Sequence, residues 1–176
     1  MSVVLPRGAT DCHCHVFGPA ARFSYAEPRS YTPDDAPLEA YLALLDRLGM
    51  DRGVLVQPSA YGRDNRAMLD ALTRVPSRLR GVAVGGAELD ASTLKRWHAA
   101  GVRSIGLVWS RPSAFGHGVP FRFPASPDTG PGLTDAGRAL VRRCAELRIV
   151  VDLSHLNAAG FADVARLGAG PIVVSH

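Results

Sequence analysis

The segment DCHCH at residues 11–15 holds the densest group of chemically reactive side chains in the sequence. If it forms a β-strand, its side chains alternate, so Asp11, His13 and His15 lie on one face and the two cysteines on the other. Two imidazoles on one strand face can bind one metal ion or one substrate group. The alternative is a pair of half-buried histidines bonded to neighbouring backbone. A zinc site built on the cysteines is less well supported, because no second pair of ligands follows at zinc-finger spacing.

Two later apolar runs, IVVDLSH and PIVVSH, both end in Ser-His, at His155 and His176. The carboxyl ends of parallel strands meet at one rim of a sheet, so these two histidines are expected beside His13 and His15. Histidine is the commonest metal ligand in proteins. The four histidines therefore predict a metal site, or a site for a polar substrate, at that rim.

Three further polar residues have less specific surroundings. Asp152 lies within the run before His155, and it is expected either to bond a ligand histidine or to be a buried acid paired with backbone. His117 lies in a loop rich in glycine and proline and is a candidate to contact the substrate. His98 falls within a helical pattern, where a surface or packing role is expected.

Short β-branched runs alternate with helical patterns along the whole chain. The predicted strands are residues 11–16, 53–57, 81–84, 104–109, 149–154 and 171–176. The predicted helices are residues 38–48, 64–73, 92–100, 135–147 and 158–167. Most of the strands are almost continuously apolar, which is typical of parallel strands covered on both faces. Repeated β-then-α units predict an α/β fold with a parallel sheet and right-handed crossovers.

Residues suited to ending and starting helices support these bounds. Glycines follow three of the helices as C-terminal stops, and N-capping side chains precede two of them. These residues are Gly49, Gly101, Gly168, Thr134 and Asn157. Two long loops, 17–36 and 110–133, interrupt the alternation. The second is rich in proline and glycine and is expected to act as an active-site lid.

The composition is that of one globular domain, with 176 residues, 47% of them hydrophobic, and a formal net charge of +4. That length buries one sizeable core rather than two. No apolar run reaches about 18 residues and the N-terminus lacks a signal-peptide pattern, so neither a membrane span nor secretion is expected. The three cysteines are then reduced thiols of a cytoplasmic protein. No basic run is interleaved with aromatic residues, so nucleic acid is not an expected partner.

Residues 1 to about 103 carry the motifs DCHCHVFGP, SYAEPRSYTPDD, VLVQPSAYGRDNRAMLDAL and LRGVAV in that order. This part of the chain resembles the 2-pyrone-4,6-dicarboxylate lactonases of the amidohydrolase superfamily. The resemblance implies that His13 and His15 are the site histidines of the first strand. It also implies that Tyr31 is a tyrosine of the substrate loop and that Ser59 lies near a substrate carboxylate. The arginine that these lactonases carry on strand four has no counterpart, because Gly106 stands there.

Residues from about 104 to 176 instead resemble the membrane dipeptidase family. The motifs are SIGLVWSRPSAFGHGVPFRFPASPDTGPGLTDAGRALVRRC, VDLSHLNAAGF and VVSH. In this family His155 and His176 match two histidines that bind the second zinc of a binuclear site. The first strand departs from the dipeptidase pattern, since it has His13-Cys14-His15 where those enzymes have His-x-Asp. The two resemblances meet near residues 98–106.

Both resemblances imply a (β/α)8 barrel of the TIM type. About six β/α units are present, so a single barrel domain over residues 1–176 that is truncated at its C-terminus is expected. The resemblance to lactonases implies a hydrolase that directs water onto the carbonyl of a small carboxylated lactone. The alternatives are a zinc metallodipeptidase and an inactive barrel fragment that only binds metal or ligand.

The resemblances also imply the partners of the chain. A divalent metal is expected, with zinc as the favoured ion and one or two ions in the site. The aspartate that activates water after the eighth strand in this superfamily has no counterpart, so no catalytic residue is assigned. The expected partners are a small-molecule substrate and, through exposed sheet edges, a second copy of the chain.

Overall fold

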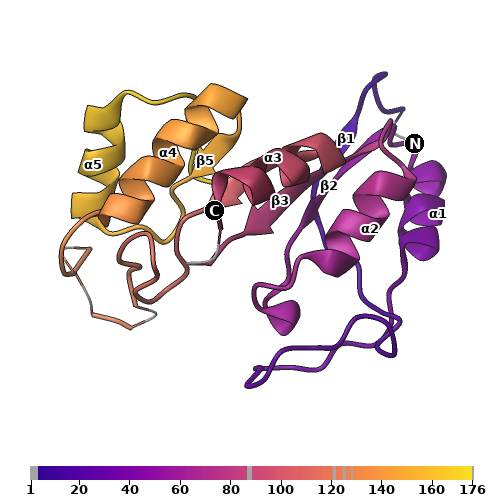
Figure 1. Ribbon diagram of the computed structural model, residues 1–176. Coiled ribbons are helices and arrows are strands. Elements are labelled where there is room, and N and C mark those ends of the chain that lie inside the picture. Colours follow the sequence, from indigo (N-terminus) through magenta and orange to yellow (C-terminus); the bar gives the residue numbers. More distant parts are fainter. Residues whose placement is uncertain (1–3, 87–88, 121, 125, 128, 176) are drawn as a thin grey trace. The chain divides into compact units, whose positions relative to one another are not determined.

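The computed structural model describes residues 4–175 apart from 87–88, 121, 125 and 128 (Figure 1). The strands are β1 (Thr10–Cys14), β2 (Arg52–Val56), β3 (Leu79–Val84), β4 (Val102–Gly106), β5 (Val150–Asp152) and β6 (Ile172–Val173). The α-helices are α1 (Leu38–Leu48), α2 (Arg66–Arg74), α3 (Ala91–Ala100), α4 (Asp135–Leu147) and α5 (Ala158–Leu167). A short 3-10 helix, η1 (Ser59–Tyr61), follows β2. No helix among the described residues is long and apolar enough to cross a membrane.

The strands follow one another in the sheet in the order β1-β2-β3-β4-β5-β6. β1, β2 and β3 pair in parallel, and so do β4, β5 and β6. Sequential parallel strands joined by helices are the arrangement of a (β/α)8 barrel, and the strands present here form part of one. The predicted fold class is therefore confirmed.

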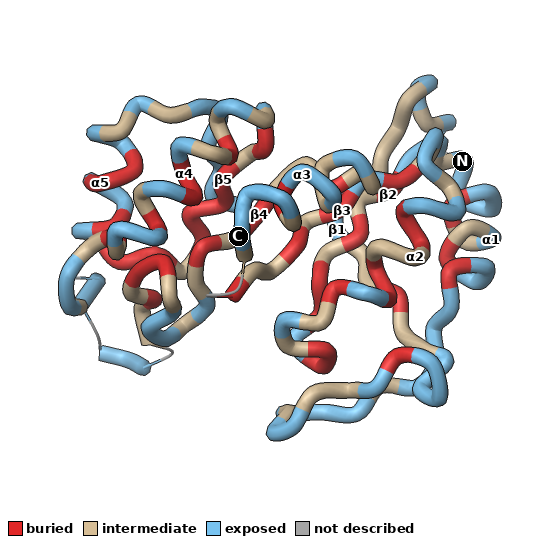
Figure 2. Tube along the Cα trace, viewed as in Figure 1, coloured by how far each residue is buried: buried red, intermediate tan, exposed pale blue. Residues whose placement is uncertain are grey.

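The chain divides into two compact units, which are described separately below. The first holds residues 1–83 and 99–102, and the second holds residues 84–98 and 103–176. Buried residues lie along β2, β3, β4 and β5 and on one face of the helices (Figure 2). Fully buried side chains of the first unit include Leu45, Leu55, Met68, Leu72 and Leu79. The core of the second unit includes Ile105, Leu140, Val141, Ile149 and Val151.

The helix ends follow the expected local chemistry. The side-chain oxygens of Thr134 and Asn157 each accept a hydrogen bond from the backbone N–H three residues on, at 3.0 and 2.9 Å. Gly49 and Gly168 end their helices in the left-handed conformation, and Gly101 also has a positive φ, of 112°. These are the residues that sequence analysis selected as caps and stops.

β3 ends at Val84 as predicted, whereas the other five strands end earlier than predicted. β4 ends at Gly106 because the chain turns there, and the Ser113 hydroxyl donates to the carbonyl of Leu107 at 2.9 Å. β5 ends at Asp152, where a turn leads into α5. The run predicted at 171–176 forms a strand only at Ile172–Val173, and its last residue, His176, lies outside the described residues.

Candidate functional site

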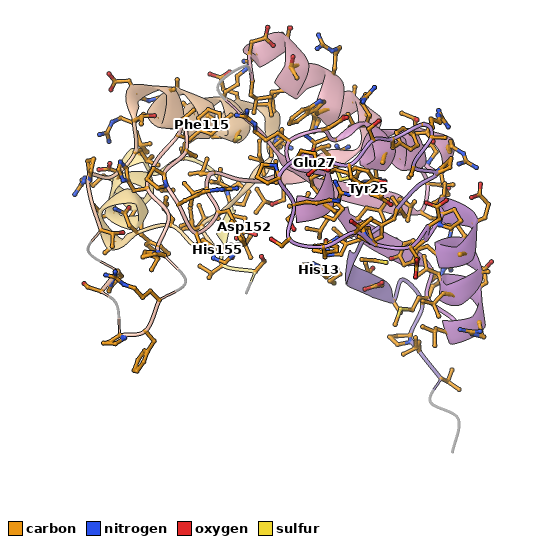
Figure 3. All side chains as sticks on the ribbon, turned by 90° about the horizontal axis from the view of Figure 1, so that it is seen from below. His13, Tyr25, Glu27, Phe115, Asp152 and His155 are labelled. Carbon is orange, nitrogen blue, oxygen red and sulfur yellow. The ribbon has the colours of Figure 1, made fainter. Side chains whose placement is uncertain are left out.

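His13 and His15 lie side by side at the carboxyl end of β1 in the first unit. Their ring centroids are 5.1 Å apart, and the rings meet edge to face at 82°. His13, labelled in Figure 3, is exposed, whereas His15 is half-buried. Two imidazoles that share a tetrahedral zinc ion at 2.0–2.1 Å from each nitrogen have centroids roughly 5 Å apart. The pair therefore fits one metal ion or one polar group of a substrate.

His15 is oriented by the backbone of the neighbouring strand. Its Nδ1 lies 2.8 Å from the carbonyl oxygen of Val56, the last residue of β2. A carbonyl only accepts hydrogen bonds, so Nδ1 carries the proton and the lone pair of the neutral ring is on Nε2. Metal-binding histidines are commonly fixed through their other nitrogen in this way.

The expectation that Asp11, His13 and His15 share one face of a regular strand is not met. The register of β1 against β2 shifts after Asp11, which marks a β-bulge and breaks the simple alternation of side chains. One oxygen of the Asp11 carboxylate accepts a hydrogen bond from the backbone N–H of His13 at 3.1 Å, and the other accepts one from the Tyr41 hydroxyl of α1 at 2.9 Å. Gly53 makes room for this contact, because a Cβ there would lie 2.2 Å from the Tyr41 oxygen. Asp11 therefore ties β1 to its covering helix.

A row of aromatic rings continues from His15 into the loop after β1. The centroids of His15 and Phe17 are 5.9 Å apart, and those of Phe17 and Tyr61 are 6.1 Å apart. Tyr25 stacks on Tyr61 at 5.0 Å, and burial together with Tyr61 raises the pKa of Tyr25 to about 12. The Tyr61 hydroxyl also accepts a hydrogen bond from the backbone of Gly18 at 2.7 Å. This row was not predicted from the sequence, although the aromatic residues of the loop after β1 could have indicated it.

Tyr31 and Ser59, the predicted substrate-binding residues of the first unit, are close in sequence to the aromatic residues of this row. Tyr31, in the loop after β1, is 44% exposed, and Ser59 is an exposed residue at the start of η1. Gln57, which sequence analysis missed, is buried and donates from Nε2 to the carbonyl of Asp64 at 3.0 Å. This bond orders the turn that carries Ser59. The substrate-binding roles of Tyr31 and Ser59 stay predictions.

His155 lies in the second unit, in the turn between β5 and α5. Its Nδ1 is 3.2 Å from the Ser110 hydroxyl, and its carbonyl accepts a hydrogen bond from Val119 at 2.8 Å. The Trp109 ring lies edge-on to it, with centroids 6.4 Å apart. His155 has a φ of 67°, a left-handed conformation that costs a non-glycine residue about 1 kcal/mol or more. Such conformations persist where surrounding contacts hold them, and they concentrate at functional sites.

Asp152 is the buried acid beside this turn, and Figure 3 shows it close to His155. One carboxylate oxygen accepts hydrogen bonds from the backbone and the hydroxyl of Ser154, at 2.9 and 2.7 Å. The other accepts from the hydroxyl of Ser175 at 2.5 Å. Burial alone would raise the pKa of Asp152, but the bonds from Ser175 and Ser154 outweigh it and lower that pKa. Both serines immediately precede a predicted ligand histidine.

Several hydrogen bonds hold the loop 110–133 against the rest of the second unit. The carbonyl of His117 accepts a bond from the backbone of Asn157 at 3.0 Å. The Asn157 amide donates to the carbonyl of Pro131 at 3.1 Å, and to those of Thr129 and Gly130. A Cβ on Gly130 would lie 2.6 Å from Nδ1 of His117, so the loop packs closely on that ring. The role of His117 in substrate binding stays a prediction.

Three of the four predicted metal-binding histidines fall within the described residues. His13 and His15 adjoin each other in the first unit, and His155 belongs to the second. His176 lies outside the described residues. Across the described chain, no group of three or more histidine, cysteine, aspartate or glutamate residues is gathered as for a metal ion. The four-histidine site therefore stays a prediction.

A known family matches nearly the whole chain, in agreement with the fold. The amidohydrolase family (Amidohydro_2) matches residues 10–176. The match covers nearly all of the chain, so the chain belongs to the amidohydrolase family, which is a family of enzymes.

Individual relatives confirm both resemblances noted in the sequence. A 4-sulfomuconolactone hydrolase from Rhizobium radiobacter is 36% identical over 182 aligned residues, which cover 100% of this chain and 55% of the relative. A probable 2-pyrone-4,6-dicarboxylic acid hydrolase from Acinetobacter baumannii, solved with citric acid bound, is similar with a TM-score of 0.65 and 28% identity over 82% of this chain and 48% of that one. A metallo peptidase from Rhodobacter sphaeroides, solved with a phosphinate mimic of L-Ala-D-Ala, has a TM-score of 0.61 and 33% identity over 96% of this chain and 64% of its own. The chain spans about half the length of the curated relative.

Proposed function

We propose that this chain supplies the histidine site of a hydrolase that opens a small carboxylated lactone by attack of water on its carbonyl. The observation that carries the proposal is the adjacent His13–His15 pair, with His15 fixed by the carbonyl of Val56. The Nε2 lone pair of His15 can serve one role at a time: it holds a metal ion, or in a metal-free site it accepts a proton from water. The pair therefore carries the groups that polarise a lactone and guide its attacking water.

The substrate class in this proposal comes from the relatives. The relative that aligns with the whole chain is named a 4-sulfomuconolactone hydrolase, and a similar structure is described as a probable 2-pyrone-4,6-dicarboxylic acid hydrolase. The substrates in both names are small anionic molecules. Exposed Tyr31 and Ser59 are the hydroxyl groups of the first unit proposed to contact such a substrate.

A divalent metal, with zinc as the preferred ion, is the cofactor in this proposal. The spacing of the His13 and His15 rings and the fixed tautomer of His15 suit a zinc ligand pair. His155 and His176 are the proposed ligands of the second unit. Bound zinc would lower the pKa of a water toward about 7 and polarise a carbonyl.

A zinc metallodipeptidase is the second candidate, and it rests on the second unit. There Asp152 accepts hydrogen bonds from Ser154 and Ser175, the serines that precede His155 and His176 in the sequence. A similar structure is described as a metallo peptidase and aligns with 96% of this chain. This candidate takes a dipeptide in place of a lactone.

The deciding experiment compares two substrates on the same protein. Ring opening of 2-pyrone-4,6-dicarboxylate is followed by ultraviolet absorbance, and cleavage of L-Ala-D-Ala is followed by amine release, each with added zinc and with chelator. The proposal predicts ring opening above the uncatalysed rate and no dipeptide cleavage. Cleavage of the dipeptide alone would establish the second candidate. Zinc binding with turnover of neither substrate would leave the alternative of a chain that only binds metal.

A further inference from the structure

We propose that Tyr61 is a positioning residue that fixes the loop 18–35 against η1 and so sets the place of Tyr31, which this loop carries. This inference rests on the substrate-binding roles proposed for Tyr31 and Ser59. Ser59 and Tyr61 are the first and last residues of η1. One short helix therefore carries one of the two proposed substrate contacts and also the residue that holds the loop with the other.

The loop 18–35 is closed at its base but has little core of its own. Phe17 and Ala36, which flank it, exchange two backbone hydrogen bonds of 2.9 and 3.0 Å. Among the residues of the loop, all of which the structure describes, only Phe23 is buried. A segment with so few buried side chains opens at low cost, so the contacts that it does make determine where Tyr31 lies.

The ring and the hydroxyl of Tyr61 both contact this loop. Tyr61 is only 2% exposed, and its hydroxyl accepts a hydrogen bond from the N–H of Gly18, the first residue of the loop, at 2.7 Å. Tyr25, labelled in Figure 3, stacks on the Tyr61 ring with centroids 5.0 Å apart. A buried tyrosine hydroxyl usually has a hydrogen-bond partner, and here that partner belongs to the loop. Tyr61 therefore holds the loop at two points.

Arg29 joins the tip of the loop to this stack. Its guanidinium lies over the Tyr25 ring, 5.8 Å from the centroid, and its Nε donates to the Thr32 hydroxyl at 2.8 Å. Tyr31 precedes Thr32 in the sequence and is 44% exposed. A displacement of the Tyr25 ring would therefore move Arg29 and, with it, Tyr31.

Two other contacts join the loop to the rest of the first unit. Ala26 donates its N–H to the carbonyl of Ala60, next to Tyr61, at 2.8 Å, so this bond also places the loop on η1. The Arg22 guanidinium pairs with Asp70 of α2 at 2.6 Å, but the Arg22 side chain is 60% exposed, and exposed ion pairs contribute little. The contacts that fix the loop thus gather at η1.

The first measurement is hydrogen–deuterium exchange of peptides that cover residues 18–35. Tyr61→Phe keeps the ring but leaves the Gly18 N–H without its acceptor, and Tyr25→Leu removes the stacked pair. Each change should speed exchange of the loop by about threefold to tenfold, the factor expected for one lost hydrogen bond or one lost aromatic pair.

Tyr41→Phe is the matched control for this measurement. Tyr41 is also a buried tyrosine of the first unit, at 5% exposure, but its hydroxyl donates to Asp11 and not to the loop. Tyr41→Phe removes one hydroxyl hydrogen bond, as Tyr61→Phe does, and should leave exchange of the loop unchanged.

The second measurement is the affinity for isophthalate by calorimetry. Isophthalate is a planar dicarboxylate that water cannot open, and it stands in for the proposed lactone substrate. Tyr61→Phe and Tyr25→Leu should each weaken its binding by about threefold to tenfold, the same factor as in exchange. In a chain that already carries Tyr31→Ala, the same two changes should have little further effect, because residues that act through one contact are not additive.

Four results would each overturn the inference. They are unchanged exchange of the loop in Tyr61→Phe and Tyr25→Leu, equally fast exchange in Tyr41→Phe, fully additive losses of affinity in the Tyr31→Ala chain, and no binding of isophthalate by the unmodified chain. Lactone turnover of the same variants tests the proposed function separately, because ring opening can be absent while isophthalate binding still depends on Tyr61.

Discussion

At the scale of single residues, the sequence left two interpretations of the β1 histidines open, a metal or substrate site and a structural pair bonded to backbone. The structure has features of both. His15 does bond neighbouring backbone, as a merely structural histidine would, since its Nδ1 meets the carbonyl of Val56. The same bond assigns the free lone pair to Nε2 and so prepares the ring for a ligand. The position of Asp11 could not be predicted, because a one-residue shift in pairing within β1 is not encoded in the hydrophobic pattern.

The three cysteines differ in reactivity for reasons that the structure makes explicit. Cys12 is exposed, and Cys14 is half-buried, with its pKa raised by burial and by the charge of Asp11. Cys144 is fully buried, and burial raises its pKa to about 12. Because the thiolate is the reactive form, a disulfide reagent at about pH 8 should label Cys12 first and Cys144 only after unfolding. Mass spectrometry of the labelled peptides checks the order, and labelling of Cys144 as fast as Cys12 would refute it.

At the scale of elements, the helices could be predicted more closely than the strands. The expected ranges of α1, α4 and α5 coincide with the structure, because caps and glycine stops act within a few residues of the helix ends. The strand ends depend on pairing with neighbouring strands, which is set by contacts distant in sequence, and on turns such as the one after Gly106. The aromatic row from His15 to Tyr25 escaped prediction for the same reason.

The two N-caps of the second unit should contribute unequally to stability. Thr134→Ala should lower the free energy of unfolding by about 1 kcal/mol, the usual value of a cap. Asn157→Ala should cost more, because its amide also donates to the carbonyls of Thr129, Gly130 and Pro131. Asn157→Asp keeps the capping oxygen but sets a buried carboxylate oxygen against those carbonyl oxygens, so it should cost at least as much as Asn157→Ala. Urea unfolding of the three variants measures this, and equal losses in both alanine variants would contradict the role assigned to the amide.

At the scale of the whole molecule, the strand order agrees with the β/α alternation of the sequence, whereas the number of domains stays a prediction. The matched family and relatives identify the chain as an amidohydrolase but do not place the histidines of the two units together. Joining those histidines requires contacts far apart in sequence, which no local pattern encodes.

Association between copies of the chain is a prediction at this scale. β6 and the residue after it expose apolar side chains, with Ile172 at 47% and Val174 at 56%. An exposed apolar strand at a sheet edge favours pairing with another chain. Light scattering should show dimers or larger species, and Val174→Lys should reduce them. Phe161→Lys, at a side chain 41% exposed on α5, should leave association unchanged. A monomer at high concentration would contradict this prediction.

The central claim is that the histidines of β1 carry out lactone hydrolysis. The most direct test is the initial rate of ring opening of 2-pyrone-4,6-dicarboxylate by the unmodified chain, His15→Ala and His98→Ala. His98 lies on α3, where burial and Arg103 lower its pKa, and serves as the control histidine. The unmodified chain and His98→Ala should open the ring at equal rates above the uncatalysed rate. His15→Ala should be slower by about 10² or more, because it loses the ring nitrogen that binds the metal or, in a metal-free site, exchanges the proton. Equal rates in His15→Ala and the unmodified chain, or no ring opening above the uncatalysed rate, would contradict the claim.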